Sequence, residues 1–289
     1  MRYRRISRLN CWALIILGLL FLALLGRPDQ ASPELEGVPA HYQNSLEMSM
    51  CLIPGGSYLI GSPPEEPGRY LNEGPQHRVT LSAFYITATE ITNAQYGRFL
   101  TDSNHPEPLY WLDKNLNAPD QPVVGVSWQD AVDFAEWLSR KTGETYRLPT
   151  EAEWEAAARG GLRGQSFPWG AELPDAGGRF RANYNPDAYG DDGFRYTAPV
   201  GQFPANGYGL FDVAGNVAEW CRDWYEASYY QHSPKANPPG PPSGKFKVLR
   251  GGSWYSRARE LRCACRQFAG PGNADGFIGF RLVRPIKNF

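Results

Sequence analysis

The chain has 289 residues, including 31 glycines, 25 prolines and nine tryptophans, and its aromatic content is 13%. This much glycine and proline argues against long regular elements, and the aromatic content argues against a disordered chain. Five of the 29 basic residues and one of the 30 acidic residues lie in the first 31 positions, which leaves 24 against 29 in the remainder. A slightly acidic domain without a basic stripe argues against nucleic acid as a partner.

The first 31 residues are predicted to be a targeting element. Four arginines before residue 9 precede an uncharged run, Leu9–Gly26. A helix of this length extends roughly 27 Å, just under the hydrocarbon thickness, so the segment is either a cleaved signal peptide or an N-terminal membrane anchor. The basic flank stays in the cytoplasm, and we expect the remainder to be exported to the periplasm or the extracytoplasmic side of the inner membrane. Residues 32–47 are polar and contain prolines, which predicts a tether.

Export would place Cys51, Cys221, Cys263 and Cys265 in an oxidising compartment, where four cysteines allow three connectivities. We expect one structural disulfide, from Cys221 to Cys263 or Cys265. The spacing Cys263-Ala-Cys265 fits neither a zinc knuckle nor a redox motif. These two residues are therefore a disulfide, buried thiols, or ligands for a soft ion such as Cu(I).

Two apolar segments predict strands. Met48–Leu59 is interrupted by Pro54-Gly55-Gly56, and Arg78–Ile86 alternates between polar and apolar positions. Three helices are predicted between residues 92 and 160 from their capping residues. These residues are Thr92 with Gln95, Ser127 with Gly143 as the C-cap, and Thr150 with Glu153. No comparable helix is expected after Gly161, so the fold class is α+β: a single compact domain with much irregular structure, over residues 48–289.

Two turn-rich segments offer oxygen ligands. In one, Asn183-Tyr184 is followed by Asp191-Asp192-Gly193-Phe194; in the other, Gly207–Trp220, Asp212 and Glu219 flank a Gly-Asn pair. Calcium takes six to eight such oxygens. Neither segment has the EF-hand pattern, so spacing alone leaves a calcium site and a plain Asx-turn both open. None of the four histidines pairs with another at i,i+4, so a histidine-based zinc site is not expected.

Eight motifs follow one another in order along the chain. They are Ile53-Pro-Gly-Gly-Ser-Tyr-Leu-Ile-Gly-Ser62, Glu90-Ile-Thr-Asn-Ala-Gln-Tyr96, Pro122-Val-Val-Gly-Val-Ser-Trp128, Arg147-Leu-Pro-Thr-Glu-Ala-Glu-Trp154, Asn206-Gly-Tyr-Gly-Leu210, Gly215-Asn-Val-Ala-Glu-Trp220, Arg250-Gly-Gly-Ser-Trp254 and Gly279-Phe-Arg281. With these motifs the chain closely resembles the formylglycine-generating enzyme, or sulfatase-modifying factor, family over nearly all of residues 48–289. The resemblance implies an irregular α+β fold related to C-type lectins. It also implies an oxidase that converts a sulfatase cysteine to formylglycine, with O₂ and with copper held by two thiols.

The resemblance further implies two structural calcium sites. The first takes the side chains of Asn183 and Asp192 and the carbonyls of Tyr184 and Phe194. The second takes the side chains of Asp212 and Glu219 and the carbonyls of Gly215 and Val217. All these positions hold suitable oxygens.

The copper cysteines of the family have no direct counterpart here. The first would stand three residues after the serine of Gly-Gly-Ser, where this chain has Ser256, and the segment expected to hold the second, Arg257–Leu261, contains no cysteine. A serine hydroxyl cannot replace a thiolate on Cu(I), so copper is not expected. The candidate catalytic residues are Ser256 and, as makeshift copper ligands, Cys263 and Cys265.

Three functions follow as alternatives. The first is binding of a protein or peptide partner by a monomer, in a cleft lined by Ser253, Trp254, Ser256, Arg266 and Arg281; alternatively, the two arginines are buried partners of core carboxylates. The second is oxidative tailoring of a small molecule, as in relatives that mature the siderophore pyoverdine in the periplasm without the copper cysteines. The third is genuine sulfatase maturation through Cys263 and Cys265.

Overall fold

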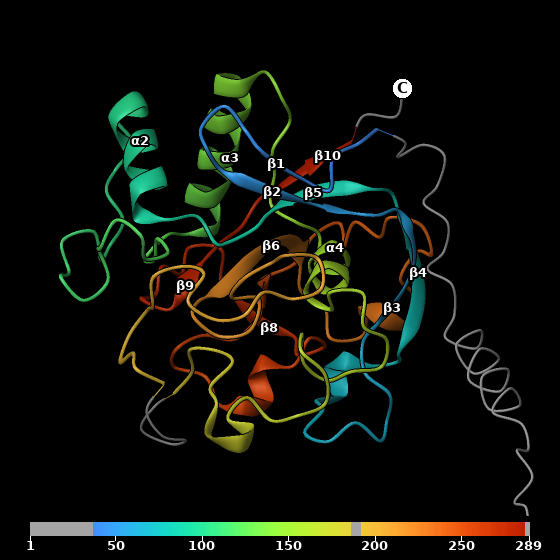
Figure 1. Ribbon diagram of the computed structural model, residues 1–289. Coiled ribbons are helices and arrows are strands. Elements are labelled where there is room, and N and C mark those ends of the chain that lie inside the picture. The colour runs from blue at the N-terminus through green and yellow to red at the C-terminus, as the bar shows by residue number, and fades with distance from the viewer. Residues whose placement is uncertain (1–36, 186–191, 287–289) are drawn as a thin grey trace, which may run out of the picture. The chain divides into compact units, whose positions relative to one another are not determined.

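The computed structural model describes residues 37–185 and 192–286. The chain divides into a unit of residues 1–38 and a unit of residues 39–289, and the second holds all the elements below (Figure 1). The expected signal peptide or anchor, residues 1–31, lies outside the described residues. Within the described ranges, no helix combines the length and the apolar character needed to cross a membrane.

The strands of the described residues form three sheets. Their bounds are β1 His41–Gln43, β2 Ser49–Ile53, β3 Gly56–Ile60, β4 His77–Leu81, β5 Phe84–Thr87, β6 Ala218–Trp224, β7 Lys247–Arg250, β8 Gln267–Ala269, β9 Ile278–Gly279 and β10 Val283–Pro285. The strand orders are β1-β2-β5-β10, β3-β4 and β8-β7-β6-β9. Neighbouring strands are antiparallel except β6 and β9, which are parallel.

The strands differ from the sequence expectation in two places. The segment Arg78–Ile86 is not one strand, because β4 and β5 belong to different sheets and the chain passes between them at Ser82-Ala83. The backbone N–H of Ser82 donates to Oδ1 of Asn237 (2.8 Å), a partner so far along the chain that no local pattern indicates it. In addition, β1 lies within the range expected to be a tether and pairs with β2, so the folded domain begins before residue 48.

The three predicted helices are confirmed. They are α2 Asn93–Ser103, α3 Trp128–Thr142 and α4 Glu151–Ala158, and each begins with a capping box after Thr92, Ser127 or Thr150. Gly143 ends α3 in the left-handed conformation, with φ of 74°. After Gly161 the described residues form only single turns of 3-10 helix: η4 Ala176–Gly178, η5 Tyr229–Gln231 and η6 Ala258–Leu261, while η3 Leu71–Glu73 lies before α2.

Helix α4 lies against β3, β6 and β7, and this region carries many buried charges. Trp154 is buried there among carboxylates that pair with buried arginines. The pairs are Glu155 with Arg159 and Arg250, Glu151 with Arg266, Glu219 with Arg281, and Glu73 with Arg262. Because each charge has a partner, the core can contain them without a prohibitive desolvation cost.

The expected disulfide does not form: Cys51, Cys221, Cys263 and Cys265 are all buried free thiols. Burial raises the pKa of Cys263 and of Cys265 to about 12, so both thiols are protonated at neutral pH. Burial raises the pKa of all three candidate partners, Cys221, Cys263 and Cys265, and the charge of Arg250 acts on each of them. The sequence shows the cysteine count but not these buried surroundings.

Candidate functional site

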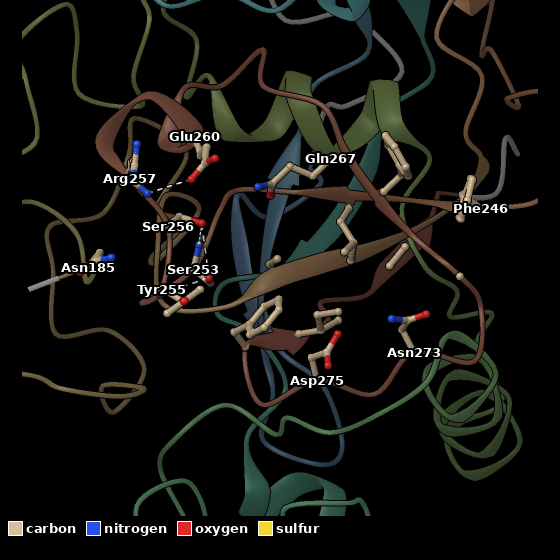
Figure 2. A pocket seen from close by; sticks show the side chains of 17 residues that line it. Asn185, Phe246, Ser253, Tyr255, Ser256, Arg257, Glu260, Gln267, Asn273 and Asp275 are labelled. Carbon is tan, nitrogen blue, oxygen red and sulfur yellow. Dashed lines mark hydrogen bonds between the residues drawn. The ribbon is translucent and has the colours of Figure 1, made fainter. Parts of the chain in front are cut away.

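A pocket of about 650 Å³ opens over the sheet β8-β7-β6-β9. We call it the cleft. Ser253, Tyr255 and Ser256 lie together at one end of it, and Phe246 lies at the other (Figure 2). Its remaining side chains come from the loop at Asn185, from Arg257 and Glu260 near η6, from β6, β7 and β8, and from residues 270–278.

Ser256 lies in a turn that the chain makes directly after β7. Gly251 and Gly252 take φ of 93° and 70°, which favours glycine at both positions. The Ser256 hydroxyl accepts a hydrogen bond from the backbone N–H of Ser253 (3.1 Å), and the Ser256 carbonyl accepts one from the N–H of Asn185 (3.1 Å). The described side chains that line the cleft include no thiol and no imidazole. Ser256 therefore has neither metal-binding sulfur nor a histidine base beside it to activate its hydroxyl.

Aromatic side chains form much of the cleft wall. Tyr255 is 64% exposed and stacks with Phe277 at 6.1 Å between ring centroids. Phe268 is 45% exposed and packs between Tyr225 and Phe246. Exposed aromatic rings are frequent anchors for peptide and small-molecule partners, because they bury a large area at low entropic cost. Neither Tyr255 nor Phe268 was predicted as a cleft residue from the sequence, although Tyr255 directly follows the Gly-Gly-Ser-Trp motif.

Trp254, expected in the cleft wall, does not line it. Its indole N–H donates to the carbonyl of Gly276 (3.0 Å), and its ring meets Tyr196 edge-on. Trp254 thus supports the turn that carries the two serines.

The structure places Arg266 and Arg281 in the core, outside the cleft lining. Arg266 donates to both carboxylate oxygens of Glu151, at 2.7 and 2.8 Å. Arg281 does the same with Glu219, at 2.6 and 2.8 Å. The alternative that both arginines are buried partners of core carboxylates therefore describes the structure.

Cys263 and Cys265 also lie outside the cleft lining, and each is 1% exposed. A copper ligand must be a thiolate, whereas burial raises the pKa of both thiols to about 12. With serine at position 256 and both thiols buried and protonated, the residues of this chain do not fit the copper centre that the resemblance implies.

The first expected calcium segment has a carboxylate that closes its loop and a buried oxygen without a partner. Oδ2 of Asp192 accepts the N–H of Tyr184 and Oδ1 accepts the N–H of Phe194, both at 2.9 Å, so the carboxylate closes the loop. Asn183 is fully buried, and its Oδ1 has no hydrogen-bond partner among the described residues. A buried carbonyl oxygen without a donor is costly, and a cation would satisfy it.

A further acid, Glu90, interacts electrostatically with Asp212 and Glu219 of the second expected segment, and it was not among the predicted ligands. Oδ1 of Asp212 and Oε2 of Glu90 are buried without a hydrogen-bond partner among the described residues. Burial raises the pKa of Glu90, and the charge of Asp212 raises it further. Three carboxylates thus share one guanidinium, that of Arg281, and this excess negative charge suits a divalent cation. Glu90 begins one of the eight motifs, so its position in the sequence was a usable signal.

Gly215 is expected to be irreplaceable in this second segment. Its φ is 84°, and an added Cβ would lie 2.1 Å from the carbonyl oxygen of Asn183. Gly215→Ala should therefore lower the free energy of unfolding by several kcal/mol, about 1–3 of them from backbone strain alone. Gly164→Ala is the matched control, because Gly164 also has positive φ, 66°, but open space around it. If urea unfolding showed the same loss of free energy of unfolding in both variants, the steric explanation would be contradicted.

Comparison with known proteins agrees with this fold. A family model described as sulfatase-modifying factor enzyme 1-like domain matches residues 36–286. The formylglycine-generating enzyme of Streptomyces coelicolor is 35% identical over 281 residues, covering 80% of this chain and 87% of that protein. The chain belongs to the sulfatase-modifying factor family.

Two further similar proteins are not described as active formylglycine-generating enzymes. The mouse protein called inactive C-alpha-formylglycine-generating enzyme 2 is 31% identical over 290 residues, covering 83% of this chain and 87% of that protein. The structure of PvdO from Pseudomonas aeruginosa is similar with a TM-score of 0.75 and 30% identity, covering 85% of this chain and 98% of that one.

Proposed function

We propose that this protein is an exported, calcium-stabilised family member that binds a protein or peptide partner in the cleft and does not oxidise cysteine by the copper route. The observation that carries the proposal is the pair Ser253 and Ser256: two hydrogen-bonded serines occupy the end of the cleft where the family resemblance calls for a thiol. Export rests on the basic and apolar N-terminal sequence.

The edge of the sheet supports a peptide as the occupant. β8 is the outermost strand of its sheet, pairing with β7 on one side and with no strand of the described chain on the other. Three consecutive residues of β8, Gln267–Ala269, line the cleft. An extended peptide can add to such an edge through main-chain hydrogen bonds, with exposed aromatic rings as pockets for its side chains. The rings of Phe268 and Tyr255 are suitably exposed.

The second candidate is oxidative tailoring of a small molecule. It is favoured by the absence of thiols from the described cleft lining, because the siderophore-maturing relatives work without the copper cysteines. The third candidate, sulfatase maturation through Cys263 and Cys265, is disfavoured by the burial of both thiols.

Site-specific photo-crosslinking in the native host separates the first two candidates. A photoreactive amino acid at position 255 or 268 of the full chain should crosslink to a polypeptide. The control is position 71, because Leu71 is 91% exposed and lies outside the cleft. An adduct of small-molecule mass at both cleft positions would support tailoring instead, and equal polypeptide crosslinking at position 71 would contradict a specific partner.

The third candidate has its own assay. The full chain is incubated with Cu(I), O₂ and a peptide containing Cys-x-Pro-x-Arg, and mass spectrometry is used to search for the aldehyde. We expect none, because neither thiol is exposed or ionised. An aldehyde that disappears in Cys265→Ser would overturn the proposed function.

Calcium is expected to raise the melting temperature, because an ion that binds only the folded state stabilises it by about 2.7 kcal/mol at 100 times its dissociation constant. Asn183→Ala removes the buried oxygen without a partner and should reduce the difference between melts in calcium and in chelator. Asn115→Ala, in an exposed loop, should leave that difference unchanged. Identical melts of the wild type with and without chelator would contradict both calcium sites.

A further inference from the structure

A second group of potential metal ligands lies between α2 and α3. Nε2 of His105 is 3.4 Å from Oδ1 of Asp130 and 3.3 Å from Oδ2 of Asp133. One ligand atom from each of the three residues lies within 4.8 Å of the others. Asp130 and Asp133 stand three positions apart on α3 and therefore share a face, while His105 follows the C-terminus of α2.

The two distances fit a pair of metal ligands as well as they fit long hydrogen bonds. A charge-assisted N–H to carboxylate bond is usually about 2.7–2.9 Å long, shorter than either contact of His105. Ligands about 2.0–2.1 Å from a tetrahedral zinc ion are roughly 3.3 Å from each other. The two contacts of His105 match that separation.

Each of the three side chains is held by its other polar atom. Nδ1 of His105 donates to the carbonyl of Pro106 (3.1 Å), so in the neutral ring the lone pair lies on Nε2, the nitrogen next to the carboxylates. Oδ2 of Asp130 accepts the N–H of Ser127 in the capping box (2.8 Å). Oδ1 of Asp133 accepts from the side chain of Gln129 (2.8 Å). Such secondary hydrogen bonds orient ligands in known metal sites.

The frame around these residues is fixed. The two helices lie next to each other (Figure 1). Asp102 at the end of α2 accepts hydrogen bonds from Trp137 (3.2 Å) and Lys141 (2.7 Å) of α3. The ring of His105 packs on Phe99 at 4.8 Å between centroids. The position of His105 relative to α3 is therefore set by packing on both sides.

A buried hydroxyl next to the carboxylates provides an independent indication of a ligand. Tyr96 is fully buried, and its hydroxyl has no hydrogen-bond partner among the described residues. Burial raises the pKa of Tyr96, and the charges of Asp130 and Asp133 raise it further, so both carboxylates act electrostatically on this hydroxyl. An unsatisfied buried hydroxyl costs about 1–3 kcal/mol, and a water molecule bound to a metal would satisfy it.

We propose that His105, Asp130 and Asp133 bind one zinc-class divalent cation, with water in the remaining position. Imidazole nitrogen with two carboxylates is a zinc-type donor set, whereas calcium requires more oxygens. The side chains are 16%, 31% and 38% exposed, so the ion can reach them from solvent. A histidine-based zinc site was not expected because no two histidines stand at i,i+4, and no local pattern places His105 beside α3.

The test uses the full chain without an affinity tag, stripped with EDTA and returned to excess calcium. Titration with ZnCl₂ in a calorimeter should show one equivalent of tight binding, and CoCl₂ should give the visible bands of a low-symmetry site. Loss of a partner that only orients a ligand weakens metal binding by about 10- to 100-fold, so His105→Gln and Asp133→Asn should each weaken it at least tenfold.

The control variant is His232→Gln. His232 also faces a carboxylate, that of Glu226 at 3.6 Å, but only one. The His232→Gln variant should bind zinc and cobalt with the same affinity as the wild type. Melts of each variant in EDTA confirm that it is folded. Wild-type zinc affinity in folded His105→Gln, or no stoichiometric binding by the wild type, would overturn the site and leave a plain histidine–aspartate ion pair.

Discussion

Replacing Glu155 with glutamine is expected to lower the free energy of unfolding by about 3–5 kcal/mol, the usual cost of breaking a buried ion pair from one side. Glu155 is fully buried. Its Oε1 accepts from Arg159 (2.6 Å) and from the N–H of Gly61 (2.8 Å), and its Oε2 accepts from Arg250. The amide of glutamine would present a donor to one of these guanidinium groups, remove the counter-ion of Arg159, and leave Arg250 only the more distant Glu151 at 3.8 Å.

Glu136→Gln is the control for this prediction. Glu136 pairs with Arg140 at 3.7 Å, but the two side chains are 63% and 69% exposed. Exposed pairs at this spacing contribute about 0.3–0.5 kcal/mol, so chemical denaturation should barely distinguish this variant from the wild type. A similarly small loss of free energy of unfolding in Glu155→Gln and Glu136→Gln would mean that water reaches Glu155.

The Glu155 pair also bears on the function of the cysteine segment. Besides Glu155, Arg250 donates to the carbonyls of Cys263 and Cys265. The backbone that carries the two thiols is thereby tied to α4, which contacts β6 and β7 of the sheet over which the cleft opens. This arrangement supports a structural role for the two cysteines, because both side chains are buried and Arg250 holds their backbone in the core.

The helices could be predicted from the sequence because their signals are local. The cap residues Thr92, Ser127 and Thr150 lie within three positions of the groups they bind. The division of Arg78–Ile86 into two strands could not be predicted, because it depends on a contact with Asn237, which is too distant along the chain to form part of a local pattern.

The cleft could be predicted only in part, for the same reason. Ser253 and Ser256 follow a glycine turn that the sequence displays, and both line the cleft. Arg266 and Arg281 carry no local signal that separates a cleft arginine from one paired in the core. Phe268 was missed because its exposure depends on how Tyr225 and Phe246 pack against it.

Asp223→Asn is expected to stabilise the protein at alkaline pH and to flatten the dependence of its stability on pH. Asp223 is buried, and burial with the nearby charge of Glu151 raises its pKa to about 8. In the unfolded chain the pKa is about 3.9, so between roughly pH 4 and 8 unfolding releases this proton and stability falls as pH rises. Above pH 8 the Asp223 carboxyl is ionised in both the folded and the unfolded state, and its contribution to stability is fully lost. Asparagine carries no proton to lose.

The substitution keeps the hydrogen bond that Asp223 makes. Oδ2 of Asp223 accepts the N–H of Glu151 at 3.1 Å, and the amide oxygen of asparagine can accept it too. The variant should therefore match the wild type near pH 4 and exceed it by on the order of 2 kcal/mol at pH 8, as measured by urea unfolding across this range. The exposed Asp120→Asn should leave the wild-type curve unchanged in shape. A constant difference between Asp223→Asn and the wild type from pH 4 to 8 would show that Asp223 does not hold a proton in the folded state, and that water or a cation compensates its charge instead.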